Sequence, residues 1–562
     1  MPAGSDVKRA GAQSRGFTAQ SRGFTIVAAL LAGLVLLPLV AVAWNALTPR
    51  FEVWEHLART QLGGLAASTV ALLAGVGVVA GTIGTGLAWL VATREFPGRR
   101  FFSWALVLPL AMPAYVIGFV FLSVFDYGGP AAQVWQSVAG ADARLPEARS
   151  YWGVVLVMSL VYYPYIYLLA RNAFAERSMA LFEAARSLGL GPVAAFRRLA
   201  IPIARPALAA GLALALMETL ADFGTVSLFG YPAFTVSVYR VWFGMFDRVA
   251  AGQLATVLLV FAGVLLALER WGRRAAKFSA PPGPPPSRAA LRGYRAWSAS
   301  ALCAFVVGIA FALPASVLVL WSVRAAELGV AWQALGRLAG NTALIAAVAT
   351  VLCVGAATAL AYATRLDRSR PLARLVHVSL LGYAIPGSVV AVGVLGVLAA
   401  ADRLMESGTG AIGMRELPLL ATSVVGLLFA YLVRFMAVAW LPVQAGLLRI
   451  TPALDESARA LGAGPRRVLA TIHAPLLRTA LVTASTLVLL DVMKEMPATM
   501  LLRPFGFDTL AVGIWQATTE SLWLQAAPPA LAVVVVGGVL VAALSKTLGA
   551  ALPAGALAEV RA

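Results

Sequence analysis

Long apolar segments recur along the whole 562-residue chain, and they restrict its fold more than any other feature. Each is about 20 residues long, which is enough for one helix to cross the hydrocarbon core of a bilayer. Backbone N–H and C=O groups cannot remain unpaired in lipid, so the segments are expected to be helices. Twelve such segments are present, at roughly 24–44, 66–92, 102–125, 152–171, 205–229, 252–268, 298–321, 341–364, 375–400, 418–440, 477–501 and 528–545.

The composition agrees with a membrane protein. Hydrophobic residues make up 60% of the chain and charged residues only 12%, which excludes an ordinary soluble domain. A transmembrane β-barrel needs short strands of alternating polarity, and these continuous apolar segments lack that pattern. We therefore predict an all-α polytopic membrane protein with about 12 transmembrane helices.

The net charge of +19 would suit nucleic-acid binding, but its distribution along the chain argues against that function. The basic residues gather in the N-terminal segment and in alternate loops, at about 94–100, 171–205, 270–295, 365–374 and 449–478. The intervening loops carry acidic residues, namely Asp126, Asp142, Glu147, Glu327, Asp402, Glu406, Glu416, Asp508 and Glu520. By the positive-inside rule, the basic loops and both termini are expected to be cytoplasmic. The charge thus predicts orientation in a lipid bilayer and no nucleic-acid partner.

A constant offset of 273 positions relates two halves of the chain. Leu62–Thr69 aligns with Leu335–Thr342, and Pro113 aligns with Pro386. Six helices in each half is an even number, so both halves enter the membrane in the same orientation, as parallel repeats with a substrate route between them. The proline-rich segment 280–286 joins the halves and is expected to be an extended connector, although such a segment could also bind a recognition domain.

These observations predict a linear organisation. It comprises a cytoplasmic tail at 1–23, a first half at 24–269 with a cytoplasmic loop at about 177–205, a linker at 270–297, a second half at 298–548 with the matching loop at about 449–478, and a cytoplasmic tail at 549–562.

Each half carries one copy of a polar, arginine-bearing motif. Glu183–Gly189 reads EAARSLG and is followed by LAIP at 199–202, while Glu456–Gly462 reads ESARALG and is followed by IHAP at 472–475. Apolar residues recur within the motifs and predict one apolar stripe on a short helix, at Met179, Phe182, Ala185 and Leu188, and at Leu454, Ala458 and Leu461. The glycines end that helix, and a following proline starts a second one. The pattern predicts a helix–glycine–helix unit that inserts into a groove on a partner; the alternative is an amphipathic helix lying on the membrane surface.

The motif spacing, Glu-Ala-Ala, three residues, Gly, nine residues and Ile-x-Leu-Pro, resembles the EAA loop by which ABC-importer permeases grip their ATPase. The departures are Ser457 in place of the first Ala, Leu199 in place of Ile, and, at the motif's Leu position, Ile201 in the first copy and His473-Ala474 in the second. The resemblance implies the type I fold of binding-protein-dependent ABC permeases and a location in the bacterial inner membrane. It also implies docking roles for Glu183, Ala184, Ala185, Gly189, Pro202, Glu456, Ala458, Gly462 and Pro475.

The implied partners are two copies of an ABC ATPase subunit, one for each half, and a periplasmic substrate-binding protein. The chain has four lysines and none follows a glycine, so no phosphate-binding P-loop can form. ATP and magnesium would therefore be bound by the partner ATPase. The chain itself is predicted to be a transport subunit and not an enzyme, with no cofactor of its own.

Acidic residues also lie inside the fifth apolar segment of each half, at Glu218, Asp222, Asp491 and Glu495. The two acids of each pair are four residues apart and so share a helix face. Charges at membrane depth are costly and normally face a protein interior or a water path. They are expected to line a route for a cationic substrate, or else to be structural and to pair with Lys494, Arg434 or helix ends.

The segments 217–225 and 491–512 resemble the fused permeases of ferric-iron importers, and the two-half layout covers nearly the whole chain. Thiamine permeases share the fused layout, whereas polyamine, sulfate and molybdate permeases carry the loop on separate chains. The three histidines, His56, His377 and His473, are widely scattered, so no metal site is predicted here. Iron would be coordinated by the periplasmic binding protein.

The leading hypothesis is therefore the permease of a ferric-iron importer. One alternative is a permease for thiamine or another small solute. A second is an ion-coupled secondary transporter that uses the membrane acids as relays. A membrane-embedded enzyme is a third, although no nucleophile–base or metal constellation is visible in the sequence.

Overall fold

The computed structural model describes residues 3–47, 51–140, 142–176, 189, 191–274, 288–329, 332–367, 369–410 and 420–551. Within these ranges the chain is almost entirely helical, and its two strands, β1 (Arg94–Glu95) and β2 (Ala289–Ala290), pair in parallel. Eleven described helices are long and apolar enough to cross a membrane, and one bent pair, Pro465–Leu476 with Arg478–Lys494, makes twelve. The predicted polytopic all-α fold is confirmed, and each of the twelve predicted segments overlaps one of these helices.

The described helices of the first half are α1 (Ala3–Leu47), α2 (Phe51–Leu57), α3 (Gly63–Thr93), α4 (Arg99–Ala105), α5 (Ala114–Phe125), α6 (Pro130–Ala139), α7 (Tyr151–Glu176), α9 (Pro192–Ala195), α10 (Ile201–Ala221), α11 (Gly224–Leu228), α12 (Phe234–Gly244) and α13 (Arg248–Arg274). Those of the second half are α14 (Tyr294–Val307), α15 (Leu313–Glu327), α16 (Trp332–Leu366), α17 (Arg370–Ser379), α18 (Gly387–Gly410), α19 (Val424–Leu448), α20 (Pro452–Ala460), α21 (Pro465–Val468), α22 (Ala474–Leu476), α23 (Arg478–Lys494), α24 (Pro497–Leu502), α25 (Leu510–Thr519) and α26 (Trp523–Ala551). Turns of 3-10 helix lie at Leu108–Ala111, Leu380–Ala384 and Leu420–Thr422, and turns of π-helix at Ala58–Leu62, Phe196–Ala200, Gly308–Ala312 and Leu469–His473.

The third segment of each half was predicted as one continuous helix, and that prediction is wrong. The helix is interrupted just before α5 in the first half and just before α18 in the second. Met112 and Ile385 precede the aligned prolines and are both extended, with ψ of 120° and 131°. A proline clashes with a helical conformation of the residue before it and supplies no N–H, so both halves break at the same place.

The fifth segment of each half is also divided, although it too was predicted to be continuous. α10 ends at Ala221 and α23 at Lys494, and the next residues, Asp222 and Glu495, are extended with ψ of 133° and 117°. Short helices, α11 and α24, then continue the chain. The second acid of each pair therefore lies just past a helix end, and not within the predicted helix face.

The first helix of each half packs against the other half. α1 lies against α16, α17 and α18, while α14 contacts α4 and α15 contacts α5. The Thr25 hydroxyl donates to Asp367 at 3.2 Å, and the Ser300 hydroxyl donates to the carbonyl of Pro97 at 2.7 Å. Each of these contacts between the halves therefore includes a hydrogen bond. Both large apolar cores consequently contain residues of both halves. The predicted halves are thus interlocked repeats.

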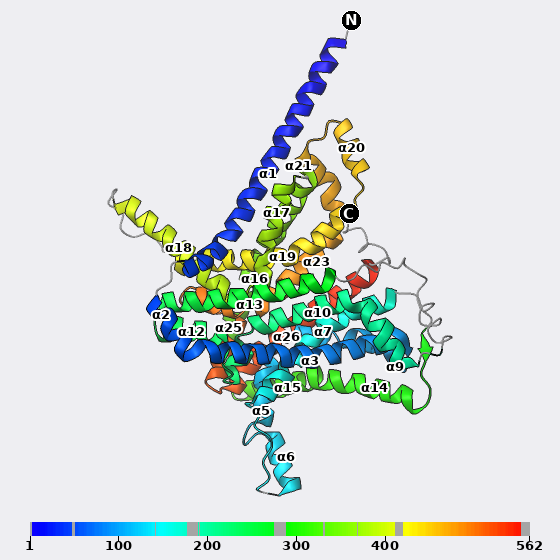
Figure 1. The fold of residues 1–562 in the computed structure, drawn as a ribbon, viewed down its shortest axis with the longest axis vertical. Coiled ribbons are helices and arrows are strands. Elements are labelled where there is room, and N and C mark those ends of the chain that lie inside the picture. The colour runs from blue at the N-terminus through cyan, green and yellow to red at the C-terminus, as the bar shows by residue number, and fades with distance from the viewer. Residues whose placement is uncertain are drawn as a thin grey trace.

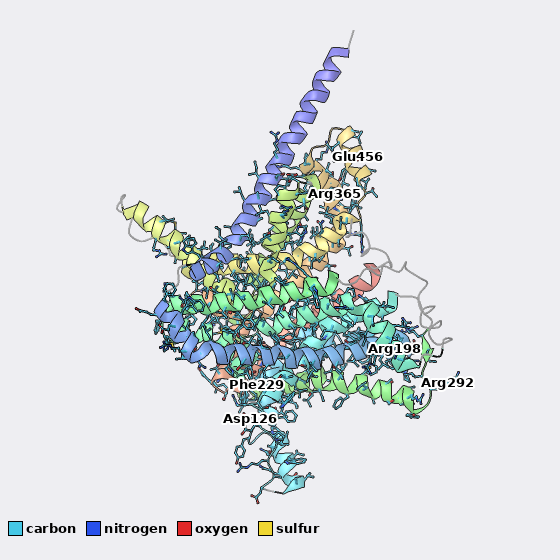
Figure 2. All side chains as sticks on the ribbon, viewed as in Figure 1. Asp126, Arg198, Phe229, Arg292, Arg365 and Glu456 are labelled. Carbon is cyan, nitrogen blue, oxygen red and sulfur yellow. The ribbon has the colours of Figure 1, made fainter. Side chains whose placement is uncertain are left out.

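The ends of the molecule divide into two sets. In Figure 1, α9, α20 and the N-terminal end of α1 lie along the upper and right edges, whereas α2, α6 and the tip of α18 lie along the left and lower edges. Figure 2 shows Arg198, Arg292 and Arg365 on the first set of edges and Asp126 on the second. This arrangement agrees with the separation of basic and acidic loops that the sequence predicts. The proline-rich segment 281–286 lies outside the described residues.

Candidate coupling loops and transport cavity

The second copy of the motif folds as a helix, a glycine turn and a second helix, as its sequence predicts. α20 starts with Pro452 and ends at Ala460, and Gly462, two residues later, has a left-handed φ of 78°. The N–H of Gly462 donates to the carbonyl of Arg459, and the N–H of Ala463 donates to the carbonyl of Ala458, each at 2.9 Å. These two bonds form a Schellman motif, which satisfies the last carbonyls of the helix.

The apolar stripe predicted for this helix is only partly buried. Ala458 is 6% exposed and packs inward, but Leu461 is 88% exposed and Leu454 is also exposed. Glu456 and Arg459 are exposed on the same short helix (Figure 2). A surface that combines a large apolar side chain with both signs of charge is suited to contact with another protein.

A buried polar cluster, which we call the clamp, fastens α20 to the membrane helices; its members are Arg365, Asp455 and His473. Arg365 Nε donates to Asp455 Oδ2 at 2.8 Å, and His473 Nε2 lies 2.7 Å from Asp455 Oδ1. The carboxylate can only accept, so Nε2 is the protonated nitrogen of that imidazole. Arg365 also donates from Nη1 to the carbonyl of Leu447 at 2.6 Å and from Nη2 to that of Ile450 at 2.8 Å. The clamp joins the ends of α16 and α19 to α20.

The first copy of the motif is only partly described. Glu183, Ala184 and Ala185 lie outside the described residues. Gly189 has a left-handed φ of 82°, close to that of Gly462, and α9 begins at the expected proline. The aligned glycines therefore have the same left-handed conformation in both halves.

The clamp has no polar counterpart in the first half. Ala92 and Ala200 occupy the positions aligned with Arg365 and His473. The surrounding contacts are aromatic: the Trp89 ring lies 5.3 Å from Phe174 and 5.2 Å from Phe196 between centroids. In the described part of the first loop, Phe196 packs against Trp89, whereas the second loop is held by ions and hydrogen bonds.

The prolines predicted to end the motif lie directly after aligned turns of π-helix. Pro202 follows the turn at Phe196–Ala200, and Pro475 follows the turn at Leu469–His473. A proline has no N–H to donate and its ring crowds the carbonyl four residues earlier, so widening the preceding turn accommodates it. Pro475 is exposed, as Glu456 is.

The four membrane acids come together around one cavity of about 80 Å³ between the halves. Its polar lining comprises Glu218, Asp222, Asp491, Glu495, Arg434, Lys494, Tyr115, Tyr162, Tyr165 and Tyr383. The volume exceeds that of a single water molecule, which needs about 10–15 Å³ on the same measure. The structure thus joins two acid pairs that lie 273 positions apart in the chain.

The second acid of each pair accepts hydrogen bonds from the start of the following short helix. Asp222 Oδ1 accepts from the N–H of Thr225 at 2.9 Å and of Val226 at 3.2 Å, and Oδ2 accepts from the Thr225 hydroxyl at 2.9 Å. Glu495 Oε1 accepts from the N–H of Ala498 at 3.0 Å. These carboxylates satisfy N–H groups that a helix start leaves free, so they also have a structural role.

The remaining contacts differ between the halves. Lys494 Nζ lies 2.9 Å from Asp491 Oδ1, and Arg434 Nη1 lies 3.3 Å from Glu495 Oε1. The proposed structural partners Lys494 and Arg434 are therefore both in place, on the second-half acids. Glu218 instead accepts from the Tyr383 hydroxyl at 3.1 Å. Among the described residues, no group of three His, Cys, Asp or Glu side chains is close enough to hold a metal ion.

The tyrosines of the cavity were not predicted from the sequence. Tyr162 and Tyr165 are three residues apart on α7 and so share a face, which was a usable signal. Tyr115 and Tyr383 come from different halves, and both lie within three residues of the proline at which the third segment of their half breaks. Their positions follow from tertiary structure.

Comparison with known proteins places this architecture among transporters. Residues 84–268 match the family described as "Binding-protein-dependent transport system inner membrane component". The chain is 25% identical over 502 residues to the "Fe(3+)-transport system permease protein FbpB 2" of Haemophilus influenzae, covering 88% of this chain and 91% of that protein. It is 31% identical over 198 residues to a "Probable molybdenum ABC transporter permease protein" of Haloferax volcanii, covering 35% of this chain and 70% of the relative. It is 29% identical over 235 residues to the "Sulfate transport system permease protein CysT" of Salmonella typhimurium, covering 40% of this chain and 82% of the relative.

Proposed function

Because the chain belongs to the family of inner-membrane permeases of binding-protein-dependent ABC transporters, we propose that the importer it serves carries ferric iron. A periplasmic binding protein delivers the cargo, and two copies of an ATPase subunit dock on the two coupling loops, at about 177–205 and 449–478. Both termini and these loops face the cytoplasm. The chain itself provides the route and the coupling contacts, while the ATPase subunits bind and hydrolyse ATP.

The charge of the cavity lining supports a cationic cargo. Four carboxylates and two cationic side chains line it, so its formal charge is negative and attracts cations. An oxyanion such as sulfate or molybdate would meet carboxylates of like charge in this cavity. The relative that aligns over 88% of this chain is named for Fe(3+) transport, whereas the sulfate and molybdenum relatives align over 40% and 35%.

The second coupling loop supports ATPase docking through its surface and its attachment. Glu456 and Leu461 are exposed at the end of a helix that the clamp holds rigidly to α16 and α19. α19 also carries Arg434, which reaches the cavity and pairs with Glu495. A displacement of α20 by the ATPase would therefore move α19, and with it one wall of the cavity.

Charge reversal on the loops tests docking. Glu183→Lys with Glu456→Lys should abolish ATP-dependent iron uptake and reduce ATPase co-purification by about tenfold or more, because like charges facing each other at an interface cost several kcal/mol. Glu520→Lys is the matched control, since Glu520 is an exposed acid outside both loops. Uptake that continues in the double variant without ATP would indicate a secondary transporter and overturn the proposal.

A further inference from the structure

The charged residues of the cavity are distributed unequally between the two halves. Glu218 and Asp222 align with Asp491 and Glu495, so each half contributes two acids. The cations come from the second half alone. Lys494 aligns with Ala221, and Arg434 aligns with Val161, both buried and apolar.

The acids of the second half are already paired with those cations. Asp491 contacts Lys494 at 2.9 Å, and Glu495 contacts Arg434 at 3.3 Å. The second pair packs against the first residue of α18, Gly387, where an added Cβ would collide with Arg434 Nη1 and Glu495 Oε1. This wall of the cavity is close to electrically neutral and tightly packed.

Among the described residues, the acids of the first half form no direct ion pair, although Glu218 lies within electrostatic range of Arg434 and Lys494. Asp222 is satisfied by the backbone and hydroxyl donors at the start of α11. Glu218 is half-buried and accepts one hydrogen bond, from the neutral hydroxyl of Tyr383. An ionised carboxylate has about four acceptor sites, so most of those on Glu218 remain available to a cation in the cavity.

A second group on the same wall lacks a partner. Tyr115 is 5% exposed, lines the cavity, and its hydroxyl makes no hydrogen bond within the described part of the chain. Leaving a buried hydroxyl unpaired costs about 1–3 kcal/mol, so its retention suits a ligand that is present only during transport. Carboxylate and phenol oxygens are both hard ligands, as hard metal cations require.

From these contacts we infer that a single wall of the cavity, formed by Glu218, Tyr115 and Asp222 of the first half, contacts the metal cation in transit. The second-half acids serve as counter-ions to Lys494 and Arg434 and make no contact with cargo. The inference rests on the proposed function and assigns the cation-binding side of its route. Its ligands are one carboxylate with a single hydrogen bond, one phenol hydroxyl and one carboxylate already bonded to the start of α11, so the contact is weak and releases the ion.

Paired substitutions separate the two walls. Glu218→Gln should lower the initial rate of ferric uptake about tenfold, and Tyr115→Phe about fivefold, the effect of losing one charged or one neutral polar contact. Asp491→Asn should also lower uptake, because it leaves Lys494 unpaired. The double variant Asp491→Asn with Lys494→Gln should recover most of that loss, whereas Lys494→Gln should not rescue Glu218→Gln.

Equal amounts of membrane-inserted complex, measured by ATPase co-purification, exclude misfolding as the cause. Wild-type uptake in Glu218→Gln, or no recovery in the Asp491/Lys494 double variant, would overturn the assignment of the walls. Rescue of Glu218→Gln by Lys494→Gln would also overturn it, since only the total charge would then matter. A wild-type complex that fails to transport ferric iron would overturn the proposed function itself, and this result is distinct from all of these.

Discussion

The two halves of this chain share a backbone plan but hold their working parts with different chemistry. Both break the third segment at a proline, and both carry a left-handed glycine in the aligned motif, with φ of 82° at Gly189 and 78° at Gly462. At the second coupling loop, charged side chains form the clamp; near the first, the described contacts are those of Trp89 with Phe174 and Phe196. The residues that determine backbone geometry are common to both halves, whereas the means of attachment differs.

The same difference appears in the cavity. Each half supplies two acids in aligned positions, but Lys494 and Arg434 neutralise those of the second half alone. Duplicated architecture therefore does not imply duplicated function. The first half presents carboxylates that form no ion pair, whereas in the second half α19 carries Arg434 at the cavity and is bonded to the clamp at its other end.

Among the substitutions that distinguish the two halves, loss of the clamp should have the largest effect on stability and ATPase binding. Asp455→Leu leaves Arg365 with no carboxylate partner at a site where both side chains are 14% exposed. Breaking such a buried ion pair costs about 3 kcal/mol. We expect thermal unfolding at a clearly lower temperature and loss of ATPase binding at the second loop.

The matched change in the first half is Trp89→Ala. It removes aromatic packing and should cost about 2 kcal/mol, because Trp89 is only half-buried and a fully buried tryptophan costs more. If a change of ionic strength altered the effects of Asp455→Leu and Trp89→Ala on the unfolding temperature equally, that result would count against the proposed difference in attachment.

Substitution of the two left-handed glycines should have the smallest effect on ATPase binding, and the effect should be the same in both halves. Gly189→Ala and Gly462→Ala each place a Cβ on a residue with left-handed backbone, so backbone strain is the expected cost. That strain is about 1 kcal/mol, or about a fivefold loss of ATPase affinity for each loop. Asparagine tolerates this conformation better and should be milder at both positions. A large effect at one glycine alone would show that the loops differ in backbone as well as in attachment.

Local sequence signals predicted much of this architecture. Apolar length gave the twelve spans, and the glycine and proline positions gave the helix–turn–helix form of the coupling loop. The breaks in the third and fifth segments were missed because a proline or an acid within an apolar run is compatible with a continuous membrane helix. Whether such a residue ends the helix depends on neighbours that receive the freed backbone groups.

The contacts that give the sites their character depend on tertiary structure. Arg365 and Asp455 are 90 positions apart, and Arg434 and Glu495 are 61 apart, so no local pattern joins them. The sequence did identify the four acids and suggested Lys494 and Arg434 as partners. It could not tell that Lys494 would pair with Asp491 and not with the adjacent Glu495.

The most direct test of the central claim is ATP hydrolysis by this chain reconstituted in vesicles with its ATPase subunits and its periplasmic binding protein. The binding protein would be loaded in turn with ferric iron, sulfate or thiamine, and entry of each radiolabelled cargo would be measured in parallel. We expect only the iron-loaded protein to stimulate hydrolysis, with iron entering the vesicles. Stimulation by the sulfate- or thiamine-loaded protein alone, or iron entry without ATP, would contradict it.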